Sequence, residues 1–268
     1  MGDSEQEGYF RVHLQGREGP FIALAPEEIT LLPVPHPDFT LDLESIDILA
    51  DGRVVVLSEK GYCLTSTGGL VVQYDETLNE IAGRGLEGLA VRPRADGGSW
   101  VAVLWEGGYT LPGKSERVDY FPMAPLLVVH DLPAGAMGFE HLLEDFPAIP
   151  LDVPVPEGEE PEAQRFRAPD LVWHRLPNGE WGFVVLLSSE NRSPNPRYLH
   201  RWIQRFNQDG KRVGDPVDIE KSLPANMQDL NWEGLGWFEE GKRLVTVHDD
   251  PYDTGPTEAL VIDLPQGW

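Results

Sequence analysis

The feature that most constrains the fold is a pattern of two apolar strands joined by a tight turn, which the sequence repeats four times. Each repeat opens on an acidic residue and closes on another one after its second strand. The turn between the strands contains Asp-Gly, Asn-Gly or Glu-Gly, which is typical of a β-hairpin. The repeats run from Glu44 to Glu59, from Glu87 to Glu106, from Asp170 to Glu190 and from Glu233 to Asp249. A diverged repeat is stronger evidence of architecture than a single motif.

The tight turns make the two strands of each repeat antiparallel neighbours. The opening and closing acids therefore lie at the same end of each hairpin. If the hairpins are the inner strands of radially arranged blades, all of these carboxylates gather on one face near the axis. We expect an all-β, single-domain β-propeller over residues 1–268, with an acidic site at one end of its axis.

The spacing of the repeats bears on the number of blades. The opening acids lie 43, 83 and 63 residues apart. The longer intervals predict irregular insertions near residues 107–122 and 146–167 rather than a lost blade. Five blades are the expectation, with six and then four as the alternatives. The last repeat supplies only three strands of its own, so we expect a strand from the apolar patches of residues 9–35 to close the ring.

Composition limits the partners. The 268 residues include 45 Asp and Glu but 21 Lys and Arg, a net charge of −24. This charge argues against nucleic acid and against anionic membrane surfaces, and it favours cations as ligands. A simpler role for much of the excess is to keep the protein soluble. The sequence indicates neither an oligomeric state nor the identity of a small-molecule or protein partner.

The cysteine content and the N-terminus suggest a location. Cys63 is the single cysteine, so no intrachain disulfide forms, and its place in a strand pattern predicts a buried side chain. The N-terminus is acidic and polar rather than signal-like, and no apolar run approaches membrane-spanning length. A cytoplasmic protein is expected, with secretion as the alternative if a leader was removed.

The converging acids predict a metal site. Calcium takes six to eight oxygen ligands, and a ring of carboxylates can supply them. A bound cation would also remove the repulsion among these carboxylates. The predicted ligands are Glu44, Glu87, Asp170 and Glu233. The alternative is that these acids cap backbone amides or pair with basic neighbours such as Arg84 and Arg192. A role for Glu87 or Glu233 as a general base is a further, less favoured alternative.

Other side chains are predicted to reach the same face. They are Glu59, Glu106, Glu190, Asp249, His248, Lys60 and Arg192. His248, beside Asp249, is a candidate ligand or proton carrier, although a structural strand-end histidine is the favoured interpretation. The aromatic residues near the hairpin ends could stack on a planar ligand, but Trp232 and Trp237 are expected to fill the wedge between blades.

The segments Leu86-Glu87-Gly88-Leu89-Ala90 and Trp232-Glu233-Gly234-Leu235-Gly236-Trp237 resemble the phytase-like or esterase-like propellers and, equally, the SdiA-regulated propeller family. Leu244-Val245-Thr246-Val247-His248-Asp249 continues the resemblance, which covers the inner hairpins. It implies a propeller with calcium near the axis. The phytase-like relationship further implies hydrolysis of phosphoesters.

Two functions follow from these expectations. The first is a binding module for a small molecule or protein, with calcium in the acidic axial site. The alternative is a calcium-dependent phosphoesterase or esterase. The repeats carry no recurring Lys or Arg for phosphate, and no nucleophile–base pair is evident, so the binding module is favoured.

Overall fold

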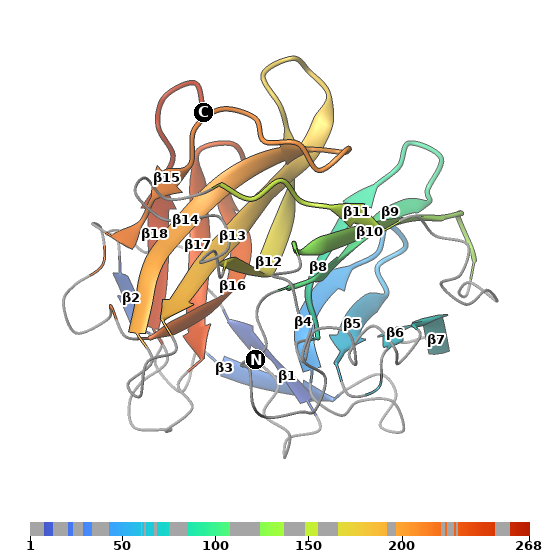
Figure 1. Cartoon of the computed structure of the whole chain (residues 1–268). Coiled ribbons are helices and arrows are strands. Elements are labelled where there is room, and N and C mark those ends of the chain that lie inside the picture. The colour runs from blue at the N-terminus through green and yellow to red at the C-terminus, as the bar shows by residue number, and fades with distance from the viewer. Residues whose placement is uncertain are drawn as a thin grey trace, which may run out of the picture.

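The structure is a computed structural model. It describes residues 8–12, 21–23, 29–33, 43–59, 61, 63–66, 69–74, 85–107, 124–136, 148–154, 166–191, 197–220, 223, 228, 230–249 and 258–268. These residues form four four-stranded antiparallel sheets, arranged as blades of a β-propeller, and a separate two-stranded sheet (Figure 1). The expectation of an all-β propeller is therefore confirmed.

The strands of each blade follow one another along the chain, with a single exception in the last blade. The first blade consists of β4 (Leu43–Ile48), β5 (Val54–Ser58), β6 (Cys63–Ser66) and β7 (Gly69–Gln73). The second blade consists of β8 (Leu86–Pro93), β9 (Ser99–Trp105), β10 (Leu126–Leu132) and β11 (Ile149–Pro150). The third blade consists of β12 (Phe166–Arg175), β13 (Trp181–Asn191), β14 (Arg197–Asn207) and β15 (Val217–Asp218). The fourth blade consists of β16 (Asn231–Glu239), β17 (Arg243–Asp249), β18 (Glu258–Asp263) and β2 (Phe21–Ala23).

The fourth blade shows how the N-terminal part of the chain closes the ring. Strand β2 pairs antiparallel with β18, with Phe21 opposite Leu260. The expected N-terminal closing strand is thus present. The remaining N-terminal strands, β1 (Gly8–Val12) and β3 (Ile29–Pro33), pair with each other instead. In Figure 1 this pair lies at the bottom of the view, below β16 and β4.

The four predicted hairpins are the inner strand pairs of the blades. Tight turns join β4 to β5, β8 to β9, β12 to β13 and β16 to β17. Gly52 and Gly179 have φ of 86° and 83° in two of these turns, a conformation that only glycine adopts without strain. Strand β11 also corrects one boundary, because Ile149–Pro150 belongs to the second blade although residues 146–167 were expected to form an insertion. Residues 108–123 lie outside the described residues.

The core lies between neighbouring blades. One apolar cluster, which includes Leu57 and Trp105, joins the first blade to the second. A second, around Trp173 and Phe183, joins the second to the third, and a third joins the third to the fourth around Trp232. Trp232 is fully buried there, and Trp237 packs against the same cluster. These two indoles fill the wedge between blades, as predicted. Cys63 is buried too.

Polar contacts join the innermost strands β4 and β8, and likewise β12 and β16. The carboxylate of Asp47 on β4 accepts the backbone N–H of Val91 on β8 at 2.6 Å, and Asp170 on β12 accepts that of Leu235 on β16 at 2.7 Å. The indole N–H of Trp237 donates to the carbonyl of Trp173 at 2.8 Å. Because each bond joins a side chain of one blade to the backbone of the next, these contacts help to hold β4 beside β8 and β12 beside β16. In the described part of the chain, no helix is long and apolar enough to cross a membrane.

Candidate axial site

Each innermost strand contains a β-bulge near its first residues. The bulge falls between Leu43 and Ser45 in β4, between Leu86 and Gly88 in β8 and between Trp232 and Gly234 in β16. The extra residues are Glu44, Glu87 and Glu233. A bulge leaves its extra residue out of the ladder and re-aims its side chain, so three blades present a glutamate in the same way.

The third blade breaks this pattern. Its bulge falls between Arg167 and Asp170 and spans two residues, Ala168 and Pro169. The charged side chain at the entrance to β12 is therefore that of Arg167. Asp170 was expected to join the glutamates, and its position corrects that expectation. Its buried carboxylate accepts the backbone N–H groups of Leu171 at 2.8 Å and of Leu235 at 2.7 Å.

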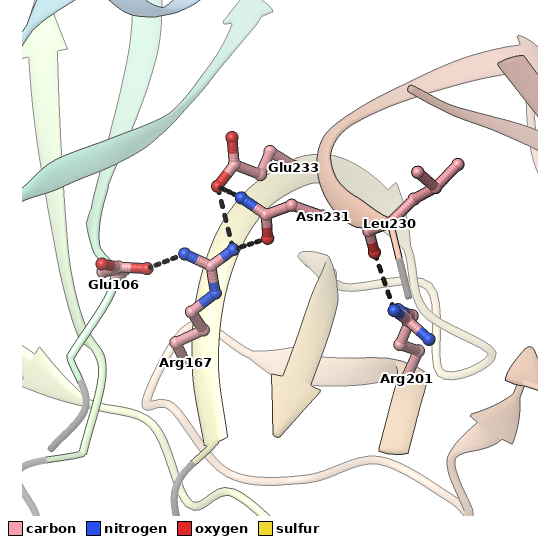
Figure 2. Close-up of polar contacts among 6 residues, drawn as sticks. All are labelled: Glu106, Arg167, Arg201, Leu230, Asn231 and Glu233. Carbon is pink, nitrogen blue, oxygen red and sulfur yellow. Dashed lines mark hydrogen bonds and ion pairs between the residues drawn. The ribbon is translucent and has the colours of Figure 1, made fainter. Parts of the chain in front are cut away.

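Arg167 forms the centre of a network that spans three blades (Figure 2). Its Nη1 donates to Oε2 of Glu106, which follows β9, at 3.2 Å, and its Nη2 donates to Oε1 of Glu233 at 2.9 Å. The same Nη2 donates to Oδ1 of Asn231, and the Asn231 amide donates to Glu233. Arg167 and Glu106 are buried, whereas the side chain of Glu233 is 26% exposed. The network thus has a closed side at Glu106 and an open side at Glu233.

The pKa of Glu87 depends on the other charged side chains of this cluster. Burial raises its pKa well above the ordinary value, and the negative charges of Glu106, Glu44 and Glu233 raise it further. The positive charge of Arg167 lowers it but does not prevail. One arginine therefore does not compensate four glutamates, and their repulsion favours the protonated form of Glu87.

The entrance to β16 is fixed by a second arginine. Arg201 on β14 is fully buried, and its Nη2 donates to the carbonyls of Gln228 at 2.5 Å and Leu230 at 2.7 Å. Its Nη1 forms an ion pair with Glu220 at 2.7 Å. Figure 2 shows Leu230 directly before Asn231, so Arg201 holds the backbone that presents Asn231 and Glu233 to Arg167.

The remaining predicted residues are placed as follows. A Cβ added at Gly85 would lie 2.0 Å from Oε1 of Glu59, and the carbonyl of Gly85 accepts the N–H of Glu106, so Glu59 lies beside the cluster. His248 is buried with its ring 5.3 Å from that of Trp232. The backbone of Asp249 pairs with Asn231, and that of Glu190 with Tyr198. The side chains of Glu190 and Asp249, and the whole of Lys60 and Arg192, lie outside the described residues.

The predicted calcium site can be compared with this arrangement. Within the described residues, no three Asp, Glu, His or Cys side chains are arranged to hold one metal ion. The cation that two of the glutamates contact is the Arg167 guanidinium. The residues as they stand therefore do not fit a calcium ion, and calcium binding stays a prediction from the sequence.

Arg167 and Asn231 were not among the residues singled out from the sequence. Aligning the repeats on their opening acids equates Asp170 with the glutamates and leaves Arg167 outside the repeat. In β12, Ala168 and Pro169 lie opposite the single residue Leu187, and the composition of the repeat does not show this register shift. Asn231 lies two residues before Glu233, and that proximity is a signal that could have identified it.

The matches to known proteins come from solved structures. No family model matches the sequence, and no curated protein matches it. A native arabinanase of Bacillus subtilis is similar in structure, with a TM-score of 0.37 and 16% identity, over 81% of this chain and 65% of the arabinanase chain. A GH43 endo-arabinanase from Bacillus licheniformis is similar with a TM-score of 0.32 and 13% identity, over 81% of this chain and 88% of the other. The phytase-like and SdiA-regulated families are not matched.

Proposed function

We propose that the axial site is an acid–base centre that hydrolyses a glycosidic or ester bond in an uncharged substrate. The observation that carries this proposal is that neighbouring carboxyl groups have different electrostatic surroundings. Burial and the charges of Glu106, Glu44 and Glu233 raise the pKa of Glu87 and favour its protonated form, whereas Glu106 and Glu233 are bonded to Arg167. Carboxyl groups whose environments differ in this way can divide the acid and base roles between them.

Glu87 is the proton donor in this proposal. Its proton passes to the leaving-group oxygen as the bond to that oxygen breaks. Glu233 is the better placed of the two Arg167 partners to accept a proton from the attacking water. Its side chain is 26% exposed, whereas that of Glu106 is 2% exposed. Glu106 and Arg167 hold Glu233 and Asn231 in place from the closed side of the network.

The charge of the site selects the substrate class. The cluster holds four glutamates and one arginine, and the N–H donors Nη1 and Nη2 of that arginine already bind Glu106, Asn231 and Glu233. A phosphoester anion would be repelled by the carboxylates. We therefore favour an uncharged glycoside or ester over the phosphoester that the family resemblance implies.

Turnover of p-nitrophenyl glycosides and p-nitrophenyl esters tests this proposal, with p-nitrophenyl phosphate as the charged comparison. Glu87→Gln is isosteric and removes the proton donor, and it is expected to lower kcat by about 10²- to 10⁴-fold. Glu180→Gln, an exposed change at a hairpin turn, is the matched control and should leave kcat unchanged.

The outcome also decides between hydrolysis and simple binding. Saturable binding of a glycoside without turnover by the wild-type protein would support the ligand-binding module expected from the sequence. Equal turnover by the wild type and the Glu87→Gln variant would overturn the role of Glu87.

A further inference from the structure

A patch of arginine and tryptophan side chains lies at the turn end of the second and third blades, at the other end of the hairpins from the bulges. This Arg–Trp patch contains Arg92 near the end of β8, Arg175 at the end of β12, and Trp100 and Trp181 near the starts of β9 and β13. Arg92 and the two indoles are half-buried, and Arg175 is exposed. The proposed hydrolysis uses none of these residues.

The indole of Trp181 lies against both guanidinium groups of the patch. The guanidinium carbon of Arg92 is 4.5 Å from the centre of this ring, and that of Arg175 is 5.7 Å from it. Arg92 also lies 4.9 Å from the ring of Trp173 and 5.9 Å from that of Trp100. A guanidinium at such a distance is attracted to the face of an aromatic ring. These contacts hold the planar group of Arg92 in place, so that binding a partner costs it less side-chain entropy.

Neither arginine of the patch has an acidic partner. Within the residues that the structure describes, the side chains of Arg92 and Arg175 donate no hydrogen bond and form no ion pair. Burial and the charge of Arg94 lower the pKa of Arg92, and no carboxylate opposes them. The Nε of Arg92 is enclosed, but its terminal nitrogens Nη1 and Nη2 are not. These two donors lie on one edge of the guanidinium and are accessible to a partner.

The other described arginines at the hairpin turns are compensated by acids. Their ion pairs are Arg53 with Asp51, Arg94 with Asp96 and Asp131, and Arg243 with Glu239. Arg92 and Arg175 therefore form an uncompensated positive site on a protein whose net charge is −24. Carboxylates of a partner would supply the missing ion pairs.

We propose that the Arg–Trp patch is a docking surface for an acidic segment of a partner polypeptide. A glutamate or aspartate carboxylate of the segment accepts Nη1 and Nη2 of Arg92 side by side. Arg175, on the neighbouring blade, pairs with a second carboxylate, and a short segment reaches both because both guanidinium groups lie against Trp181. Nucleic acid is disfavoured as the partner, because its continuous phosphates would extend beyond the patch over a strongly acidic protein.

Fluorescence anisotropy of a rhodamine-labelled hexaglutamate peptide tests this surface, with labelled hexaserine as the uncharged comparison. The wild-type protein should bind hexaglutamate in preference to hexaserine, and added salt should weaken the binding. Arg92→Met and Arg175→Met should each raise the Kd for hexaglutamate about tenfold. Arg243→Met is the matched control and should change this Kd by less than about twofold. Arg243 also lies over an aromatic ring, that of Phe238, but it is paired with Glu239.

All three substitutions remove one positive charge, so the difference between them separates the patch from the net charge. Equal binding of hexaglutamate and hexaserine by the wild type would overturn the proposal, and so would an equal loss of binding in Arg243→Met. Tighter binding of labelled hexathymidylate, lost in the Arg92 and Arg175 variants, would reassign the surface to nucleic acid. Arg175 is exposed, so Arg175→Met keeps the test decisive even if Arg92→Met does not fold. Because the readout is binding rather than turnover, it is independent of the proposed hydrolysis.

Discussion

The carboxylate of Asp170 accepts the backbone N–H of Leu235 at 2.7 Å, and this bond joins the innermost strand of the third blade to that of the fourth. Its other oxygen accepts the N–H of Leu171 at 2.8 Å. Asp47 repeats the arrangement between the first and second blades, with bonds to Ile48 and Val91. The acid expected to bind metal is thus a link between blades, which is the alternative role that the sequence left open.

Replacing Asp170 should therefore cost stability. Asp170→Ala leaves the buried N–H of Leu171 and the partly buried N–H of Leu235 without their acceptor, and each unsatisfied buried group costs about 1–3 kcal/mol. Urea denaturation measures the loss. The exposed Asp209→Ala is the control and should change the free energy of unfolding much less. An unchanged midpoint for Asp170→Ala would mean that the bond contributes nothing to joining the blades.

Asp170 also predicts how stability depends on pH. Burial raises its pKa to about 8, whereas an aspartate in the unfolded chain ionises near its ordinary value of 3.8. Between these values the folded state binds a proton that the unfolded state has lost. Stability should therefore fall as pH rises from about 4 towards 8, by at most about 1.4 kcal/mol per pH unit from this group.

Urea denaturation across this pH range checks the dependence. The variant Asp170→Asn does not titrate at this position, and its stability should fall less steeply with pH than that of the wild type. Parallel pH profiles for the two proteins would show that Asp170 is ionised in the folded state.

Removing Arg167 should uncover the repulsion that it now offsets. Arg167→Met leaves the buried Glu106 and the half-buried Glu233 without their cation. Breaking a buried pair from one side costs about 3–5 kcal/mol. The double variant Arg167→Met with Glu106→Gln should recover part of this loss, as measured in a double-mutant cycle. Additive losses in the cycle would argue that Arg167 and Glu106 do not interact.

The same variant tests the calcium prediction. Without Arg167 the glutamates lose their internal cation, so calcium is expected to raise the Tm of Arg167→Met more than that of the wild type. A larger calcium response in the wild type would favour the metal site predicted from the sequence over the network centred on Arg167.

Gly85 makes room for Glu59. A Cβ on residue 85 would lie 2.0 Å from Oε1 and 2.1 Å from Cγ of Glu59, so Gly85→Ala requires the Glu59 side chain to move. We expect a loss of about 1–3 kcal/mol on unfolding. The double variant Gly85→Ala with Glu59→Ala should recover much of it, because the obstructing atoms are then absent. A Gly85→Ala protein as stable as wild type would show that Glu59 is easily displaced.

The sequence determined the hairpins and their orientation. The Asp-Gly, Asn-Gly and Glu-Gly turns and the apolar strands around them are local features, and they predicted the inner strand pairs and the gathering of Glu44, Glu87, Glu106 and Glu233 at one end. The tertiary structure decided which charge each blade presents there. The bulge in β12 lies between Arg167 and Asp170, so Arg167 lies where a glutamate was expected and Asp170 bonds to β16. A bulge depends on how strands pack across blades, and local residue patterns do not encode that packing.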